Sequence, residues 1–209
     1  MKRKMMRPRY LRSIMLGLVL LSGQVANVIA AEAIPYTTPR VSESWIPYTS
    51  SGYVGVNLGV PKFHTECYRL FSCDNPQVSG KIYTGGLFAR AIGMELGYIN
   101  VGHAPRNGGH ISAQGINLSL VGNLPLGDTF NLFAKVGGTY GWTRTSASPL
   151  LISYPTGRKD GLGLSYGAGF AISTSTKTQI LAEWERHDFN FRPGISAVEV
   201  YSIGFKYLF

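Results

Sequence analysis

Residues 201–209 form the segment YSIGFKYLF, in which large apolar residues alternate with smaller or polar ones. The large residues are Tyr201, Ile203, Phe205, Tyr207 and Phe209. Between them lie Ser202, Gly204, Lys206 and Leu208. Alternation of this kind indicates a β-strand, because successive side chains of a strand point to opposite faces of a sheet. One face of this strand is therefore strongly apolar, and the question is what it faces.

The same period of two recurs upstream, so we expect eight strands between residues 52 and 209. The apolar faces of six of them begin at Val54, Ile92, Ile116, Phe130, Leu162 and Ile180. The remaining segment, KIYTGGLFAR at 81–90, has no clear phase. We expect long connections near 61–80, 102–110, 144–160 and 187–197, in turn with short ones near 90–91, 125–128 and 173–176. An up-and-down meander whose two ends face different environments has this asymmetry.

Side-chain volume decides which face is inside. A soluble lipocalin-like barrel would also alternate, but the interior of an eight-stranded barrel is only just wide enough for side chains. The apolar face includes Phe130, Tyr140, Trp142, Phe170 and Trp184, which is too much bulk for that space. The opposite face consists of Gly, Ser, Thr and Asn with a few charges. The sequence therefore predicts an all-β, eight-stranded antiparallel transmembrane β-barrel with its large apolar residues toward lipid and every backbone group paired by closure.

The N-terminus has the layout of a secretory signal peptide at residues 1–30. Six basic residues precede an apolar run of about ten residues, too short to span a bilayer as a helix, and small residues place cleavage after Ala30 or Ala31; a short anchor helix is the alternative. Removing these six from 20 Lys and Arg leaves 14 against 11 Asp and Glu, so the formal charge of +9 falls to +3. We therefore expect no nucleic-acid partner. Residues 31–51 are rich in Pro, Ser and Thr and predict an exposed periplasmic extension before the barrel at 52–209.

The two cysteines, Cys67 and Cys73, lie in the first long connection. An exported protein meets an oxidising compartment, so we expect them to form a disulfide that closes a small loop. His64 lies nearby, but two Cys and one His lack the fourth ligand of a structural zinc site. We expect no metal and no cofactor.

Taken together, these segments resemble the OmpA-like family of eight-stranded outer-membrane barrels. The resemblance covers roughly 52–209 and is carried by YVGVNLG, GMELGYINVG, LFAKVGGTYGWTRT, LSYGAGFAI, LAEWERHDF and the closing YSIGFKYLF. It implies a Gram-negative outer membrane, contact with its lipid and lipopolysaccharide, and a C-terminal aromatic strand read by the barrel-assembly machinery. The assembly signal would comprise Tyr201, Ile203, Phe205, Tyr207 and Phe209. The best-known members continue into a periplasmic peptidoglycan-binding domain, so the barrel-only members are the closer likeness and no cell-wall tether is implied.

Alternation places five charged residues on the lumen face: Glu95, Lys135, Glu183, Glu185 and Lys206. Charges in a narrow interior have to pair, so we expect a salt-bridge network that plugs the lumen. The resemblance implies a similar network, sometimes described as a gate. We favour plain charge neutralisation over gating.

His110 and Ser112 are the candidate residues for a hydrolase, because lipid A deacylases are also eight-stranded barrels that use a His and a Ser two apart together with a Glu. No acid follows until Asp128 and no Glu until Glu183, so no residue would orient the base. His103 and His187 are expected in loops or at strand ends, in contact with solvent. We therefore expect no enzyme.

The sequence favours a monomeric outer-membrane barrel with a structural or adhesin-like surface role, exercised through four outer loops whose host or surface ligand is unspecified. The alternatives are a narrow channel for ions or small solutes and, third, a lipid A-modifying enzyme.

Overall fold

The computed structural model describes residues 49–65, 71, 73–89, 91–151 and 153–209. The expected signal peptide and most of the expected extension fall outside these residues, as does Cys67. No helix in the described ranges is long and apolar enough to cross a membrane.

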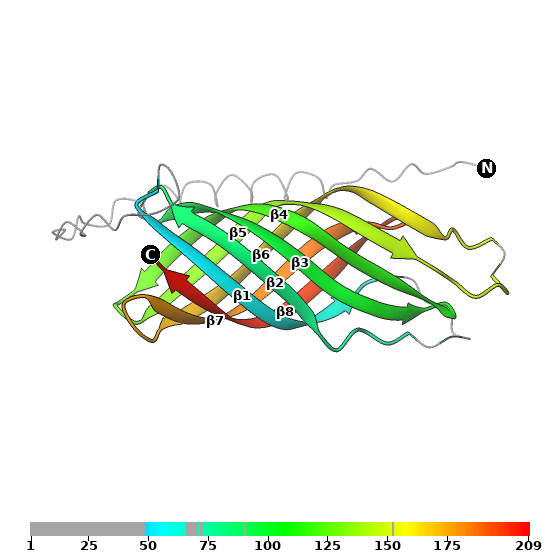
Figure 1. The fold of residues 1–209 in the computed structure, drawn as a ribbon, viewed down its shortest axis with the longest axis horizontal. Helices are drawn as coiled ribbons and strands as arrows, with labels where there is room; N and C mark the ends of the chain where they lie inside the picture. Colours follow the sequence, from blue (N-terminus) through cyan, green and yellow to red (C-terminus); the bar gives the residue numbers. More distant parts are fainter. Residues whose placement is uncertain (1–48, 66–70, 72, 90, 152) are drawn as a thin grey trace, which may run out of the picture. The chain divides into compact units, whose positions relative to one another are not determined.

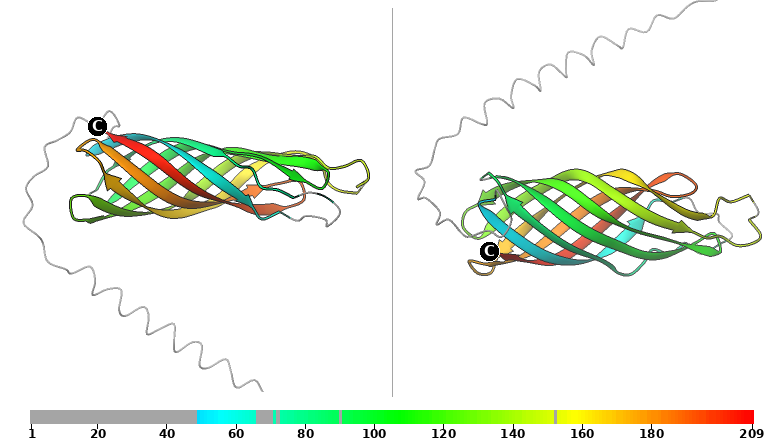
Figure 2. Two further views of the ribbon diagram at one scale, coloured as in Figure 1. Left: turned by 90° about the horizontal axis from the view of Figure 1, so that it is seen from below. Right: turned by 45° about the horizontal axis from the view of Figure 1, so that its top comes forward.

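Eight antiparallel strands follow one another around a closed barrel, as predicted (Figure 1). They are β1 (Ser51–Phe63), β2 (Ser79–Leu87), β3 (Ile92–Arg106), β4 (Gly109–Leu126), β5 (Phe130–Thr145), β6 (Gly157–Ser173), β7 (Thr178–Asn190) and β8 (Ile195–Leu208). Each strand pairs with its neighbour in sequence, and the strands run oblique to the barrel axis in all three views (Figures 1 and 2).

Pairing of β8 with β1 closes the barrel. The register runs from Tyr53 opposite Leu208 to Phe63 opposite Val198. Beyond it, the Gly52 N–H donates to the Phe209 carbonyl at 3.0 Å, and the Phe209 N–H donates to the Gly52 carbonyl at 2.9 Å. Closure leaves no sheet edge, which is the condition for a β-sheet to cross hydrocarbon.

The outer face carries the large apolar side chains over a band that fits a bilayer. Its exposed members include Val56, Leu96, Leu118, Leu164 and Ile203. On β5 the outward apolar residues run from Phe130 to Tyr140, which spans about 33 Å along a strand that rises about 3.3 Å per residue. A tilt of about 40° converts this length to a height of about 25 Å, the usual height of the lipid-facing band.

Beyond this band the polarity of the two faces reverses. On β3 the outward Tyr98 is followed by the buried, inward Ile99 and then by the exposed Asn100. On β4 the inward residues at this end are Ile111 and Ala113, while the outward neighbours are polar. An apolar interior with a polar coat is the arrangement of a barrel in polar surroundings, so the strands extend past the hydrocarbon layer of the membrane.

This extension corrects two of the predicted loops. The β3–β4 connection is only the turn at 107–108, and β7 and β8 are joined by 191–194. Asn107 and Gly108 have φ values of +54° and +70°, as a two-residue type I′ hairpin requires. The connections at 64–78 and 146–156 are long, as predicted, and those at 88–91, 127–129 and 174–177 are short.

Glycines inside the barrel make room for aromatic rings. Tyr53 lies opposite Gly85, and Tyr83 lies opposite Gly55. A β-carbon on Gly85 would lie 2.5 Å from Tyr53 Cζ, so the ring covers the glycine across the strand pair. The two tyrosine rings meet edge to face at 6.1 Å.

Candidate functional site

A network of buried ion pairs crosses the middle of the lumen. Lys135 Nζ lies 2.8 Å from Glu95 Oε1 and 2.5 Å from Glu183 Oε1. Lys81 Nζ lies 3.0 Å from Glu95 Oε1 and 2.5 Å from Glu185 Oε1. The structure thus brings four of the five residues expected on the lumen face into one chain of contacts, which also includes Lys81 of β2.

Other polar side chains contact or approach these carboxylates. The Tyr53 hydroxyl donates to Glu95 Oε2 at 3.2 Å, and Asn57 Nδ2 donates to Glu183 Oε2 at 2.8 Å. His187 Nε2 lies 3.8 Å from Glu185 Oε2, and its Nδ1 lies 2.8 Å from Thr139 Oγ1. The expectation that His187 contacts solvent is wrong, because the residue is on the inner face of β7 and is 1% exposed.

Lys206, the fifth expected residue, is buried in the lumen but stands apart from the ion pairs. Within the described part of the chain, no carboxylate lies within 4.0 Å of its ammonium group. The ammonium lies over the ring of Tyr53 at 4.5 Å and over that of Phe133 at 5.2 Å. Cation–π contact therefore replaces the expected ion pair.

The charges of this layer balance. Its lysines are Lys81, Lys135 and Lys206, and its carboxylates are Glu95, Glu183 and Glu185. Sequence reasoning missed Lys81, since the phase of β2 was not clear. Once the strand is in register, Lys81 and Tyr83 point inward and Ile82 points outward.

Two apolar clusters enclose the charged layer, which corrects the expectation of a lumen filled by small and polar groups. Toward the end with the short connections lie Tyr53, Tyr83, Val121, Phe133, Ala171 and Leu181. Toward the other end lie Phe63, Ile99, Val101, Ala104, Ile111, Ala113, Phe189, Phe191, Val198 and Val200. The lumen is thus filled by an apolar, a charged and a second apolar layer.

The two long connections are held at the end of the barrel opposite Phe209 (Figure 2). Arg106 at the end of β3 donates to Thr65 Oγ1 at 3.1 Å, to the Asp74 carbonyl at 2.7 Å and to Asn75 Oδ1 at 2.9 Å. In the second connection, the Ser148 N–H donates to the Asn107 carbonyl at 2.9 Å. These bonds tie described parts of both connections to the β3–β4 hairpin.

The candidate hydrolase residues do not form a triad among the described residues. His110 and Ser112 lie on β4, where Ser112 is opposite His103. His110 Nδ1 lies 3.0 Å from Ser146 Oγ. Among the described residues, no carboxylate pairs with His110 or His103, and no group of three His, Cys, Asp or Glu could hold a metal. Cys73 is described but Cys67 is not, so their disulfide stays a prediction.

Comparisons with solved structures find the same fold at low sequence identity. Ail, the attachment invasion locus protein of Yersinia pestis, has a TM-score of 0.52 at 13% identity, over 76% of this chain and 98% of that one. Neisserial surface protein A has a TM-score of 0.57 at 11% identity, over 75% and 96%. The N-terminal β-barrel domain of Pseudomonas aeruginosa OprF has a TM-score of 0.52 at 11% identity, over 75% and 97%.

A comparison with curated protein sequences finds no match. The family model of the OmpA-like transmembrane domain matches residues 47–184, which run from just before β1 into β7. The match agrees with the closed eight-stranded barrel and its apolar outer band. The chain therefore belongs to the OmpA-like transmembrane domain family of outer-membrane β-barrels.

Proposed function

We propose that the protein is a non-conducting outer-membrane barrel that acts at the cell surface, in an adhesin-like role, through its two long extracellular connections. Export would depend on the cleaved signal peptide at 1–30, and insertion on the aromatic strand that ends at Phe209. The observation that carries the proposal is the filled lumen together with a preformed extracellular end.

The filled lumen argues against a channel. A hydrated ion would have to pass two apolar layers. In one of them Val101 is 0% and Phe189 is 1% exposed, and in the other Leu181 is 2% exposed. Between these layers the ion would have to break ion pairs of 2.5 to 3.0 Å. Burying an ion away from water without a partner is costly. The packed interior therefore disfavours the passage of ions through the barrel.

The extracellular end supports recognition. Hydrogen bonds to Arg106 fix described parts of the 64–78 connection, and the Ser148–Asn107 bond fixes the start of the 146–156 connection. A surface ordered before binding loses less conformational entropy when a partner docks. The Yersinia pestis neighbour is an attachment invasion locus protein, which is consistent with such a role for this fold.

Attachment of bacteria tests the proposal. A host strain without adhesins that displays this protein should attach to cultured cells or to immobilised matrix proteins more than the same strain with an empty vector. Replacing residues 146–156 by an Asn-Gly turn should reduce attachment, because β5 and β6 would then end in a plain hairpin. Attachment equal to the empty vector, or unaffected by shortening both long connections, would refute the role.

Conductance measurements distinguish the proposed surface role from that of a narrow channel. In planar bilayers the purified barrel should give no discrete current steps, because the three layers fill the lumen. Regular steps in the wild-type protein would favour the narrow channel instead.

The mass of extracted lipid A tests the third alternative, a lipid A-modifying enzyme. Lipid A extracted from cells that express the protein should have the mass of lipid A from control cells, since no acid pairs with His110 in the described part of the chain. A new lipid A species would favour the enzyme.

A further inference from the structure

A row of outward residues crosses four strands just beyond the apolar band. The register places His103 of β3 opposite Ser112 of β4, and Ser112 opposite Arg144 of β5. Arg144 in turn lies opposite Arg158 of β6. All four residues are on the outer wall of the barrel rather than in its lumen.

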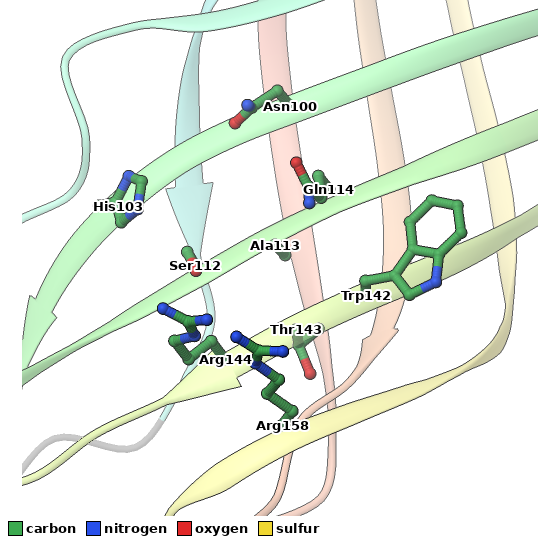
Figure 3. Close-up of a pocket in the computed structure, with 9 residues that line it drawn as sticks. All are labelled: Asn100, His103, Ser112, Ala113, Gln114, Trp142, Thr143, Arg144 and Arg158. Carbon is green, nitrogen blue, oxygen red and sulfur yellow. The ribbon is translucent and has the colours of Figure 1, made fainter.

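The row borders an open pocket of about 660 Å³ on this outer wall (Figure 3). Asn100 and Gln114 line the same pocket, and Trp142 forms its border toward the apolar band. In Figure 3, Arg144 and Arg158 extend from neighbouring strands toward the same side of the wall, facing Ser112.

The height of the pocket places it in the headgroup layer. Trp142 follows the outward Tyr140 at the upper limit of the apolar band, and the two rings meet edge to face at 5.4 Å. Trp and Tyr concentrate where hydrocarbon gives way to headgroups. Arg144 is the next outward residue on β5, so its guanidinium lies where lipid phosphates lie.

The two arginines form no ion pair with the described part of the protein. Among the described residues, no carboxylate lies within 4.0 Å of either guanidinium. The nearby Asp160 accepts a hydrogen bond of 2.5 Å from the Tyr140 hydroxyl. Like charges directly opposite each other on paired strands destabilise a sheet. An anion from outside the protein would remove this repulsion.

The neutral groups of the pocket also present donors. The Tyr98 hydroxyl donates to Gln114 Oε1 at 2.8 Å, which leaves the Gln114 amide NH₂ to point at a ligand. The Gly102 N–H donates to Asn100 Oδ1 at 2.9 Å, which leaves the Asn100 NH₂ in the same way. Two guanidinium groups and two amide NH₂ groups suit an acceptor-only ligand.

We propose that this pocket binds the phosphate group of a phosphorylated glycolipid, the lipid A portion of lipopolysaccharide, in the outer leaflet, with Arg144 and Arg158 as its charged ligands. Guanidinium groups match phosphate oxygens in bidentate geometry. The acyl chains of the lipid would lie against the apolar band below Trp142. This site on the wall is separate from the loop surface and does not depend on the proposed adhesin-like role.

Native mass spectrometry of the full barrel in detergent micelles can count bound lipid. Wild-type protein should bind phosphorylated lipid A at least tenfold more tightly than lipid A from which phosphatase has removed the phosphates. The double variant Arg144→Gln, Arg158→Gln should bind phosphorylated lipid A at least tenfold more weakly than wild type, because it loses charge-assisted hydrogen bonds on both strands.

Arg186→Gln is the matched control. Arg186 points outward on β7 two residues after Trp184, just as Arg144 follows Trp142, but it lies 3.6 Å from Asp188 and outside the pocket. This variant should bind phosphorylated lipid A like wild type. Circular dichroism should be the same for all three proteins, because none of the substituted side chains faces the lumen. The thermal midpoint of neither variant should fall below that of wild type, and the double variant also loses the repulsion between Arg144 and Arg158.

Three results would overturn the proposal. The first is equal affinity of the double variant and wild type for phosphorylated lipid A. The second is equal affinity of wild type for phosphorylated and phosphatase-treated lipid A. The third is displacement of the bound lipid by inorganic phosphate at the same concentration of phosphate groups, since the site would then be one for soluble anions.

Discussion

Replacing Lys135 by methionine should destabilise the barrel by breaking the centre of its ion-pair network. Lys135 Nζ lies 2.8 Å from Glu95 Oε1 and 2.5 Å from Glu183 Oε1, and the residue is 5% exposed. Methionine keeps most of the side-chain volume but removes the charge. Glu95 would retain Lys81, whereas Glu183 would retain only the amide of Asn57.

The expected loss of unfolding free energy follows from the loss of charge balance among the buried residues. The layer holds three lysines and three glutamates in the folded protein, so the substitution leaves one excess negative charge among buried carboxylates. Removing one partner of a buried pair typically costs about 3–5 kcal/mol. Adding Glu183→Gln restores neutrality, and a glutamine oxygen can still accept from Asn57. The double variant should therefore recover about half of the loss or more.

Urea unfolding in lipid vesicles measures this free energy, with Leu132→Met as the control. Leu132 is on the same strand, points to lipid and is 44% exposed, and volume-conserving apolar changes cost less than about 1.5 kcal/mol. Lys135→Met with the stability of wild type would refute the reasoning. A double variant no more stable than Lys135→Met would also show that charge balance is not what the network provides.

Three further changes have expected outcomes. Deleting Phe209 should lower the fraction of protein inserted in the outer membrane far more than Tyr207→Phe does, and equal insertion in membrane fractions would exclude an assembly signal there. The Cys67–Cys73 disulfide should be intact in non-reduced protein, so two free thiols in the mass spectrum would show that prediction wrong, and losing the bond should leave the barrel folded. Gly85→Val should destabilise the barrel by about 1–3 kcal/mol, because its side chain would press against the ring that covers the glycine. Gly122 is exposed and a β-carbon there would meet no atom nearer than 4.0 Å, so Gly122→Val should change the unfolding midpoint little.

The alternation of large apolar and small or polar residues predicts which side chains face outward on strands whose two faces differ in side-chain size. On β5, Phe130, Leu132 and Val136 face outward while Lys135 faces inward, as predicted. On β2, Ile82 and Tyr83 put one large residue on each face, and glycines follow. Side-chain size therefore does not show which residues of β2 face the lumen, and sequence reasoning missed Lys81. The contacts of Lys206 could not be predicted from the sequence either. They depend on the positions of the lumen residues along the barrel axis, which are set by the stagger between strands.

Two of the predicted loops are too long, because the outward residues at these strand ends are polar, as loop residues usually are. The sequence does contain a signal for the true boundary: two adjacent residues that are both apolar where the phase changes. Tyr98 faces outward and Ile99 inward, and Val200 faces inward and Tyr201 outward. These pairs indicate where a strand leaves the hydrocarbon layer and enters polar surroundings. Sequence alone does not show that the resulting inward residues, such as Phe189, fill the lumen together.

Closure of the barrel by β1 and β8 has a consequence for how fast the protein can fold. Tyr53 and Leu208 belong to the first and last strands, so their contact forms only when nearly the whole described chain is in place. Folding slows as contacts become more distant in sequence, since the chain entropy is lost before such contacts form. Until then, an open sheet exposes two unpaired edges and a band of aromatic residues to water, which is a template for aggregation. The periplasmic lifetime of the unclosed chain, rather than the stability of the finished barrel, should therefore limit its yield, and a helper that holds β1 and β8 near each other would act on this slow step.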